Sequence, residues 1–258
     1  MTSTAVCFYS ILAGMVDMQR VALVTGGAKR VGRAIVERLA DAGFDIAFTY
    51  RGSKNEARAL TDDLAARGRA AIAIQADFTQ LPTAIDAVEN EFRAAFGRLD
   101  VLVNNASIYE PASLAATDLA LMRRLWAVHA EAPLLLAQRF AADLRRSRGH
   151  IVNMVDLLAE RPLPRYLAYC ASKAALLNLT LGLARELAPE VTVNGIAPGT
   201  VEWPEGYPVS EQEKYLKRVP LGRTGTPNDV AETVLFLCTA GTYITGQIIR
   251  LDGGRSIT

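Results

Sequence analysis

The sequence contains few of the residues that form disulfides or metal sites. Its three cysteines, Cys7, Cys170 and Cys238, are odd in number and far apart, and it has two histidines, His129 and His150. These spacings fit neither a disulfide framework nor a zinc motif. We therefore predict a protein without a metal site that works in a reducing compartment, the cytoplasm.

The sequence also lacks an excess of charge and a long hydrophobic run. Lys and Arg total 28 and Asp and Glu 27, a net charge of +1, which favours neither a nucleic-acid partner nor an anionic membrane surface. The apolar run at 5–16 is shorter than the roughly 20 residues that span a bilayer. No Lys or Arg precedes it, whereas secretion signals begin with basic residues. We interpret 1–19 as a poorly ordered N-terminal extension, with Met15 or Met18 as an alternative start; a secretion signal is the other interpretation.

What the sequence does contain is an alternation of short apolar strands and helices. Expected strands occupy 20–25, 45–50, 70–75, 99–103, 150–155, 191–196 and 247–251, and expected helices occupy 34–40, 55–67, 82–96, 118–144, 166–187 and 228–238. This pattern is typical of a parallel sheet covered on both faces. We predict a single Rossmann-type, doubly wound α/β domain over 20–258, with a seven-stranded parallel sheet flanked by helices and a substrate loop at about 199–225.

A turn rich in glycine follows the first expected strand and precedes a helix. Gly26 and Gly32 mark the start and end of this turn. Strand, glycine turn and helix form the context of a dinucleotide phosphate site, because glycine adopts backbone angles closed to other residues and the helix amides face the pyrophosphate. Gly32 would also let the helix pack closely on the strand. A plain turn is the alternative interpretation.

The residues after the second expected strand bear on the choice of cofactor. NAD-binding proteins usually place an acid there to hold the ribose hydroxyls. Between Phe44 and Asn55 the only acid is Asp45, which opens the strand. Positive charge and hydrogen-bond donors come instead from Lys29, Arg30, Arg51 and Ser53. They favour NADPH, whose 2′-phosphate binds such groups; a solvated basic loop is the alternative.

A tyrosine and a lysine lie one helical turn apart, at Tyr169 and Lys173. Residues four apart share one face of a helix. A free phenol titrates near pH ~10, and a cation beside it, shielded from water, lowers that pKa. We expect the pair to donate or accept a proton near neutral pH; an ordinary solvated helix face is the alternative.

These motifs together resemble the short-chain dehydrogenase/reductase family over about 20–257. The family's TGxxxGxG, NNAG, YxxxK and PG motifs and its TGQ…DGG ending have counterparts at 25–32, 104–107, 169–173, 198–199 and 245–254. The resemblance implies an NADPH-dependent oxidoreductase acting on a small molecule. It also implies a homotetramer, with the long helices that begin near Asp118 and Tyr166 at the interface.

Three departures from the family pattern resemble its pteridine reductase branch. Arg30 and Ser107 replace glycines, and Asp156 stands thirteen residues before Tyr169, where the family usually has its catalytic serine. Bacterial members of that branch also resemble this sequence at 153–156 and 203–205. The branch implies reduction of a pterin C=N bond in a dihydropterin, biopterin, dihydromonapterin or dihydrofolate-type substrate. Hydride would go to carbon, and a proton would reach nitrogen with the help of Tyr169.

The resemblance implies a role for each site residue. Catalysis would fall to Asp156, Tyr169 and Lys173, with Lys173 holding the nicotinamide ribose and keeping the pKa of the Tyr169 phenol low. The substrate would contact Arg30, Ser107, Tyr109, Asp156, Tyr169 and Trp203, with the Tyr109 ring stacked on one pterin face. The cofactor would contact Gly26, Lys29, Arg30, Val31, Tyr50, Arg51, Ser53, Asp77, Phe78, Asn105, Ala106, Ser107, Met154, Lys173, Pro198 and Gly199.

Several of these residues have a purely structural alternative. Asp156 could cap the turn after its strand, Tyr109 could be an ordinary rim aromatic, and Trp203 could anchor the loop. His129 takes the place of an active-site asparagine of the family. We interpret it as a helix-packing residue satisfied by backbone rather than as a catalyst.

Two other functions compete with pterin reduction. The first is a carbonyl or 3-ketoacyl reductase with the same fold, against which Arg30 and Asp156 argue. The second is a nucleotide-binding protein without catalysis, against which the Tyr169–Lys173 pair argues.

Overall fold

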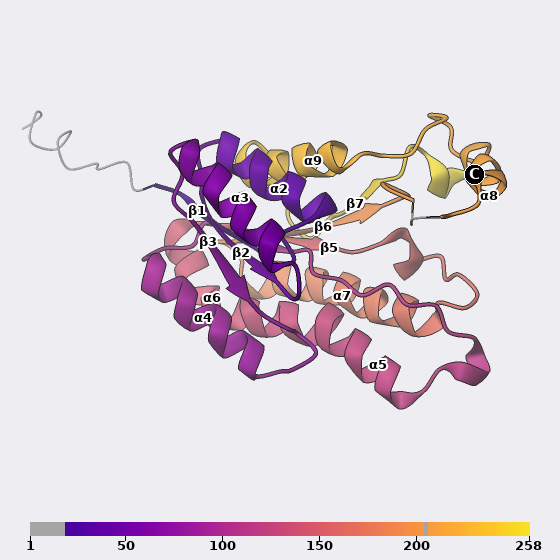
Figure 1. The fold of residues 1–258 in the computed structure, drawn as a ribbon, viewed down its shortest axis with the longest axis horizontal. Helices are drawn as coiled ribbons and strands as arrows, with labels where there is room; N and C mark the ends of the chain where they lie inside the picture. Colours follow the sequence, from indigo (N-terminus) through magenta and orange to yellow (C-terminus); the bar gives the residue numbers. More distant parts are fainter. Residues whose placement is uncertain (1–18, 204–205) are drawn as a thin grey trace, which may run out of the picture.

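Seven parallel strands form one sheet at the centre of the molecule (Figure 1). The computed structural model describes residues 19–203 and 206–258, so the predicted N-terminal extension lies outside the described residues except for Gln19. The sheet order is β3-β2-β1-β4-β5-β6-β7, and every pair is parallel. The strands are β1 (Val21–Val24), β2 (Asp45–Tyr50), β3 (Ala71–Gln75), β4 (Val101–Asn104), β5 (His150–Met154), β6 (Thr192–Pro198) and β7 (Ile248–Leu251). The predicted seven-stranded Rossmann-type fold is confirmed.

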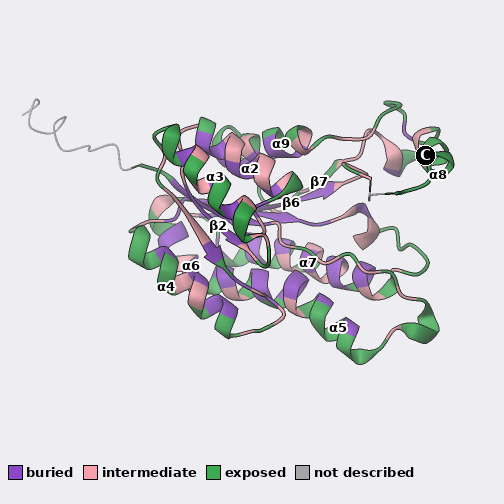
Figure 2. Cartoon of the chain, viewed as in Figure 1, coloured by how far each residue is buried: buried purple, intermediate pink, exposed green. Residues whose placement is uncertain are grey.

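Helices cover both faces of the sheet, so the strands are buried from both sides (Figures 1 and 2). One face carries α2 (Arg30–Asp41), α3 (Lys54–Ala66) and α9 (Pro227–Thr239). The other carries α4 (Thr83–Ala95), α5 (Leu119–Trp126), α6 (Ala132–Ser147) and α7 (Leu167–Glu186). Burial on both faces explains why the strands are apolar nearly throughout.

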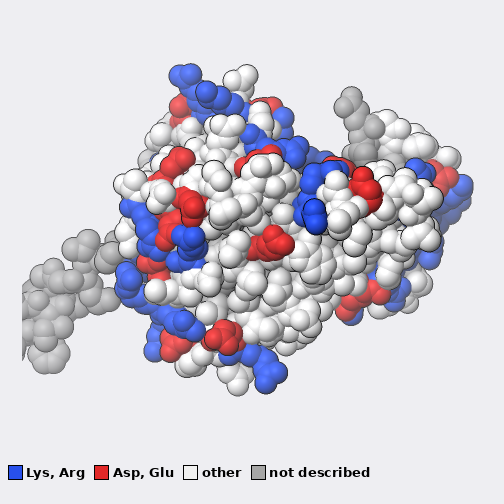
Figure 3. Space-filling view, turned by 90° about the horizontal axis from the view of Figure 1, so that it is seen from below, with Lys and Arg blue, Asp and Glu red and all other residues white. Residues whose placement is uncertain are grey.

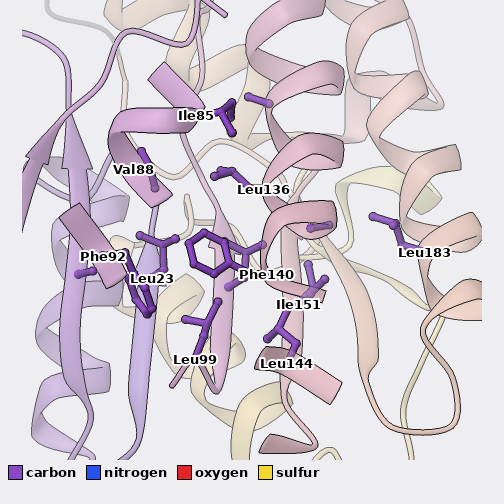
Figure 4. Close-up of a cluster of buried hydrophobic side chains, with 14 of the residues drawn as sticks. Leu23, Ile85, Val88, Phe92, Leu99, Leu136, Phe140, Leu144, Ile151 and Leu183 are labelled. Atoms are coloured by element: carbon purple, nitrogen blue, oxygen red, sulfur yellow. The ribbon is translucent and has the colours of Figure 1, made fainter. Parts of the chain in front are cut away.

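Each layer has its own apolar core. In the layer of α4 and α6, Phe140 is fully buried and meets the Phe92 ring edge-on, with centroids 5.0 Å apart (Figure 4). Truncating such a residue to alanine typically costs about 3–5 kcal/mol. In the other layer, α2 and α9 pack against each other and place Leu39 and Val230 in the second core. The two cores hold the sheet rigid beneath its carboxyl edge.

Among the described helices, α7 alone has the length and apolar composition of a membrane span. It packs against β5 and β6, and its buried residues include Tyr169, Ser172 and Lys173. A helix in this position is covered by the sheet on one side, which accounts for its apolar character.

The expected long helix over 118–144 is confirmed as one helical run, and a π-helical turn lies within it. α5 ends at Trp126, a π-helical segment covers Ala127–Glu131, and α6 begins at Ala132. Pro133 gives the reason, because proline has no amide hydrogen and its ring clashes with the carbonyl four residues earlier. A wider π turn relieves that clash. His129 consequently lies in the middle of an irregular turn.

The segment predicted as a substrate loop at about 199–225 contains a short helix, α8 (Val209–Leu216). The amide of Gly225 donates to the Thr200 carbonyl at 3.0 Å, which ties the two ends of the segment together. The amide of Thr200 donates to the Tyr215 hydroxyl, also at 3.0 Å. The segment therefore folds back over the carboxyl edge of the sheet as a closed unit.

Candidate active site

A cavity of about 1580 Å³ opens at the carboxyl edge of the sheet. It lies next to β1, which has β2 on one side and β4 on the other. At this point the order in which strands are added to the sheet reverses. Ligands of doubly wound proteins bind at such a reversal. All the predicted site residues line the cavity except Met154 and Lys173.

The glycine turn forms one end of the cavity and leaves no space for side chains. Gly26 has a φ of +67°, and a Cβ there would come within 3.0 Å of the Ala106 Cα. A Cβ at Gly32 would collide with the Gly26 carbonyl, so α2 packs closely on the turn as predicted. Asn105 fixes the turn from the neighbouring strand, since its side-chain amide donates to the carbonyls of Thr25 (2.9 Å) and Gly26 (3.1 Å).

The basic residues of this end differ in how they are engaged. Lys29 pairs with Glu56 at 2.5 Å, and Arg30 pairs with Glu202 at 2.5 Å. Sequence reasoning missed both acids: Glu56 lies in the first turn of α3, directly after the stretch between Phe44 and Asn55 that has Asp45 as its one acid. Arg51 has no ion pair in the part of the chain that the structure describes. It is the basic side chain best placed to receive a phosphate beyond β2.

The Tyr169 hydroxyl donates to the Asp156 carboxylate at 2.7 Å. The other oxygen of Asp156 accepts the amide of Leu158 at 2.8 Å, so Asp156 also caps the short 3₁₀ turn after β5. Asp156 thus caps the turn, as the structural interpretation expects, and it also binds the Tyr169 hydroxyl; its catalytic role stays a prediction. The cap fixes the carboxylate, and the fixed carboxylate orients the phenol.

The expectation of a low pKa for the Tyr169 phenol is wrong. Burial raises the pKa of Tyr169 well above 10, and the negative charge of Asp156 raises it further. The Lys173 ammonium does not counter this, because it donates to the Met154 carbonyl at 2.7 Å and lies 5.9 Å from the Tyr169 ring centre. Tyr169 is therefore a protonated phenol at neutral pH, suited to donate a proton rather than to accept one.

Lys173 is buried, with 3% of its surface exposed. Burial lowers the pKa of its ammonium group to about 8, although the charge of Asp156 acts in the opposite direction. The fold thus keeps a cation behind Tyr169 that is near its titration point at neutral pH.

His129 connects the π-helical segment to the backbone of Tyr169. Its Nε2 atom accepts the amide of Ile108 at 3.2 Å, so the ring proton sits on Nδ1, which donates to Ser172 Oγ at 2.8 Å. Ser172 donates in turn to the Tyr169 carbonyl at 2.7 Å. Burial lowers the pKa of His129 to about 2, which keeps the ring neutral. The His129 ring is thus packed between helices, as interpreted. Its hydrogen-bond partners are the hydroxyls of Ser107 and Ser172 as well as the backbone amide of Ile108.

Two aromatic clusters line the cavity. Tyr109 stacks on Tyr166 with ring centroids 4.5 Å apart, and it meets the Tyr169 ring edge-on at 4.8 Å. Trp203 stacks on Tyr207 at 5.0 Å and meets Tyr215 edge-on. One face of the Tyr109 ring, which we predicted to stack on a pterin, is therefore covered by Tyr166. Trp203 is anchored by neighbours in its own segment, yet its ring lines the cavity.

Sequence reasoning missed many residues that line the cavity, among them the tyrosines and arginines Arg161, Tyr166, Tyr207, Tyr215, Arg218 and Arg255. Tyr166 could have been found, because it lies three residues before Tyr169 at the start of the same helix. The others come from α8 and from irregular segments that only the folded chain brings together. Among the described residues no group of His, Cys, Asp and Glu could hold a metal ion.

The chain belongs to the short-chain dehydrogenase/reductase family of oxidoreductases. The family description that matches, over residues 26–256, is enoyl-(acyl carrier protein) reductase. Pteridine reductase 1 of Leishmania tarentolae is 36% identical, over 92% of this chain and 96% of that protein. The 3-oxoacyl-(acyl-carrier-protein) reductase of Staphylococcus aureus is 35% identical, over 92% of this chain and 98% of its own. Relatives with two different activities are therefore equally similar.

Solved structures of the family superpose closely on this fold. A blue fluorescent protein from a metagenomic library, in complex with NADPH, has a TM-score of 0.86 and 37% identity, covering 92% of this chain and 98% of its own. A short-chain dehydrogenase from Burkholderia cenocepacia, in complex with NADP, has the same TM-score and identity, covering 93% and 99%.

Proposed function

We propose that this protein reduces a pterin C=N bond with NADPH, and that Tyr169 supplies the proton. One observation carries the proposal: a carboxylate, Asp156, holds the Tyr169 hydroxyl at 2.7 Å, in the position where carbonyl reductases of the family have a serine. A pterin presents an amino group and ring nitrogens, which are donors that a carboxylate accepts. Each oxygen of Asp156 keeps a free lone pair beside its present bond, so the residue can hold the substrate and the phenol together.

The glycine-turn end of the cavity fits NADPH. The open backbone at Gly26 and the N-terminus of α2 provide amides for a pyrophosphate. Arg51 and Ser53, which follow β2, suit the 2′-phosphate, in agreement with the NADP complexes among similar structures. NADPH, when bound, supplies the hydride. Lys173 stands behind the site with one hydrogen bond made and two donors left for ribose hydroxyls.

The two aromatic clusters suit a flat heterocycle. Tyr109 is 48% exposed and offers one face to the cavity, since Tyr166 takes the other. Offset stacking of aromatic rings contributes about 0.5–1.5 kcal/mol beyond the area that it buries. An aliphatic substrate would gain less from these walls than a pterin would.

The protonation state of Tyr169 agrees with the reductive direction. Its raised pKa means that the phenol keeps its proton until a strongly basic atom forms beside it. The nitrogen of a C=N bond becomes such an atom when the neighbouring carbon gains a hydride. Asp156 then resists a lasting phenolate through repulsion of like charges, which favours rapid reprotonation of Tyr169.

One observation favours a carbonyl or 3-ketoacyl reductase as a second candidate. The Ser107 hydroxyl, which bonds to His129 Nε2 at 2.9 Å, lowers the pKa of the Tyr169 phenol against the larger effects of burial and Asp156. A serine hydroxyl beside the tyrosine is what the family uses to hold a substrate carbonyl. The equal similarity to a 3-oxoacyl reductase agrees with this candidate.

A turnover assay separates these candidates. The purified protein is supplied with NADPH and either dihydrobiopterin or a β-ketoacyl thioester, and oxidation of NADPH is followed by absorbance. Pterin reduction with little ketone reduction supports the proposal. Ketone reduction alone would replace it by the second candidate, and NADPH binding without turnover of either substrate would point to a nucleotide-binding protein.

We further infer a homotetramer. Exposed apolar residues gather on the helices expected at the interface: Leu119, Met122, Trp126, Leu134, Leu167 and Leu181. Figure 3 views the molecule from below, the side on which α5 lies in Figure 1, and shows a broad area with few charged side chains, interrupted by one acidic patch. Exposed apolar patches of this kind mark association surfaces. Light scattering on the purified protein measures the state, and Trp126→Glu should dissociate it.

A further inference from the structure

Besides Arg51, three arginines line the cavity without a carboxylate partner among the described residues. In the part of the chain that the structure describes, Arg161, Arg218 and Arg255 make no ion pair, although all three reach the cavity. The acids nearby are already engaged: Glu160 pairs with Arg250, Glu202 with Arg30, and Glu211 with Lys214, and the Asp252 carboxylate accepts the amides of Gly254 and Ser256. The three arginines therefore keep guanidinium groups that no carboxylate of the described residues pairs with.

Arg255 shows the strongest sign of a missing partner. Its Nε atom is buried and has no hydrogen-bond partner within the described residues. A buried donor left unsatisfied costs stability, and native proteins rarely keep one without a use. The guanidinium lies over the Tyr215 ring, 5.5 Å from its centre, which holds it in place.

Arg218 and Arg255 are neighbours although 37 residues separate them along the chain. The Thr258 hydroxyl lies between them, 2.9 Å from the Arg218 carbonyl and 3.1 Å from the Arg255 carbonyl. In Figure 1 the C-terminus and α8 lie together at one end of the molecule, away from β2, which Arg51 directly follows. The charge is thus at the substrate side of the cavity and is separate from the basic residue suited to the cofactor's 2′-phosphate.

We propose that the substrate carries an anionic arm, a carboxylate or a phosphate, and that Arg161, Arg218 and Arg255 receive it while the reducible group lies at Tyr169. The proposal rests on the proposed function insofar as the reducible group is a pterin. A pterin with a carboxylate-bearing side chain, as in dihydrofolate, then fits better than one with a neutral side chain. Arginine binds such oxyanions through paired, charge-assisted hydrogen bonds.

The test compares charged and neutral substrates in two matched pairs. Dihydrofolate and dihydrobiopterin share the pterin ring, and only the first ends in carboxylates. Acetoacetyl-coenzyme A and acetoacetyl-N-acetylcysteamine share the ketone, and only the first carries phosphates. We expect the charged member of the productive pair to have the higher kcat/KM, and the preference to shrink as salt is raised, because exposed charges are screened.

The variants are Arg255→Gln and Arg218→Gln, with Lys217→Gln as the matched control. Lys217 is the C-cap residue of α8, next to Arg218, and does not line the cavity. Its variant therefore removes one positive charge, as the arginine variants do, without changing the cavity. Each arginine variant should lower kcat/KM for the charged substrate about tenfold, with the neutral substrate unchanged. Arg218 is exposed, so its variant keeps the test valid if Arg255→Gln fails to fold.

The outcomes are distinguishable. Equal kcat/KM within the productive pair, or equal losses on its charged and neutral members, overturns the anionic arm while the proposed function stands. Turnover of the ketone pair alone overturns pterin reduction. The anionic arm is then tested by comparing kcat/KM for the charged and the neutral ketone. If neither pair is reduced, both the function and the arm are wrong.

Discussion

Replacing Asp156 with serine should impair pterin reduction far more than it impairs folding. One oxygen of Asp156 accepts the Tyr169 hydroxyl at 2.7 Å, and the other accepts the Leu158 amide at 2.8 Å. Serine can keep the bond to the Leu158 amide, because short hydroxyl side chains cap such turns, but it cannot make both bonds. The lost charge-assisted hydrogen bond contributes roughly 1.5–3 kcal/mol, which corresponds to about a 10- to 150-fold loss in kcat/KM.

The assay is steady-state kinetics of Asp156→Ser on a dihydropterin and on a simple diketone, with NADPH binding followed by fluorescence. Cofactor affinity should barely change, since Asp156 contacts Tyr169 rather than the glycine turn. Asp156→Asn is the matched control, because it keeps the shape and one acceptor oxygen but removes the charge. Should Asp156→Ser reduce the pterin as fast as the wild type, Asp156 would be a turn cap only, and the proposed function would lose its main support. Improved diketone turnover would favour the carbonyl reductase.

Three further predictions concern the cofactor and the proton donor. Tyr169→Phe keeps the ring but removes the proton, so kcat should fall about 100-fold or more while NADPH still binds; a near-normal kcat would show another donor. NADPH should be preferred over NADH at least about tenfold, and Arg51→Asp should narrow or reverse this, whereas equal kcat/KM for both cofactors in the wild type refutes the role of Arg51. Burial lowers the pKa of Lys173 from 10.5 to about 8, so the charged lysine destabilises the folded state below pH 8. The free energy of unfolding, relative to Lys173→Met, should therefore rise between about pH 8 and 10.5, by up to about 3 kcal/mol; a flat difference in denaturant titrations would contradict this.

The sheet and most helices could be predicted because their signals are local. Apolar runs such as that of β2 and the periodicity of α7 depend on residues that are neighbours along the chain. The π-helical segment could not, because the steric demand of Pro133 can be met by a kink, a break or a wider turn, and only packing selects among them. α8 lies in a segment whose prolines and glycines obscure one short helix.

The candidate site could be predicted where a motif names the residue, and not where the fold sets its environment. The spacing to Lys173 points to Tyr169, and the family resemblance points to Asp156, yet the direction of the Tyr169 pKa shift depends on burial and on where the Lys173 ammonium points. The three arginines proposed to bind the anionic arm could not be predicted from the sequence, since Arg161 and Arg255 come from segments that are far apart in it.

Arg30 holds a backbone conformation that suits glycine, with a φ of 52°. An L-residue in this region loses roughly 1–2 kcal/mol of folding stability. The Arg30 side chain forms an ion pair with Glu202 that is largely exposed, so the pair offsets little of this loss. With the cofactor- and substrate-binding role that we predict for Arg30, stability and activity would make opposite demands on this turn. A selection for heat resistance alone would be expected to convert Arg30 to glycine, and the variants it yields would hold their fold better while losing the guanidinium at the mouth of the cavity.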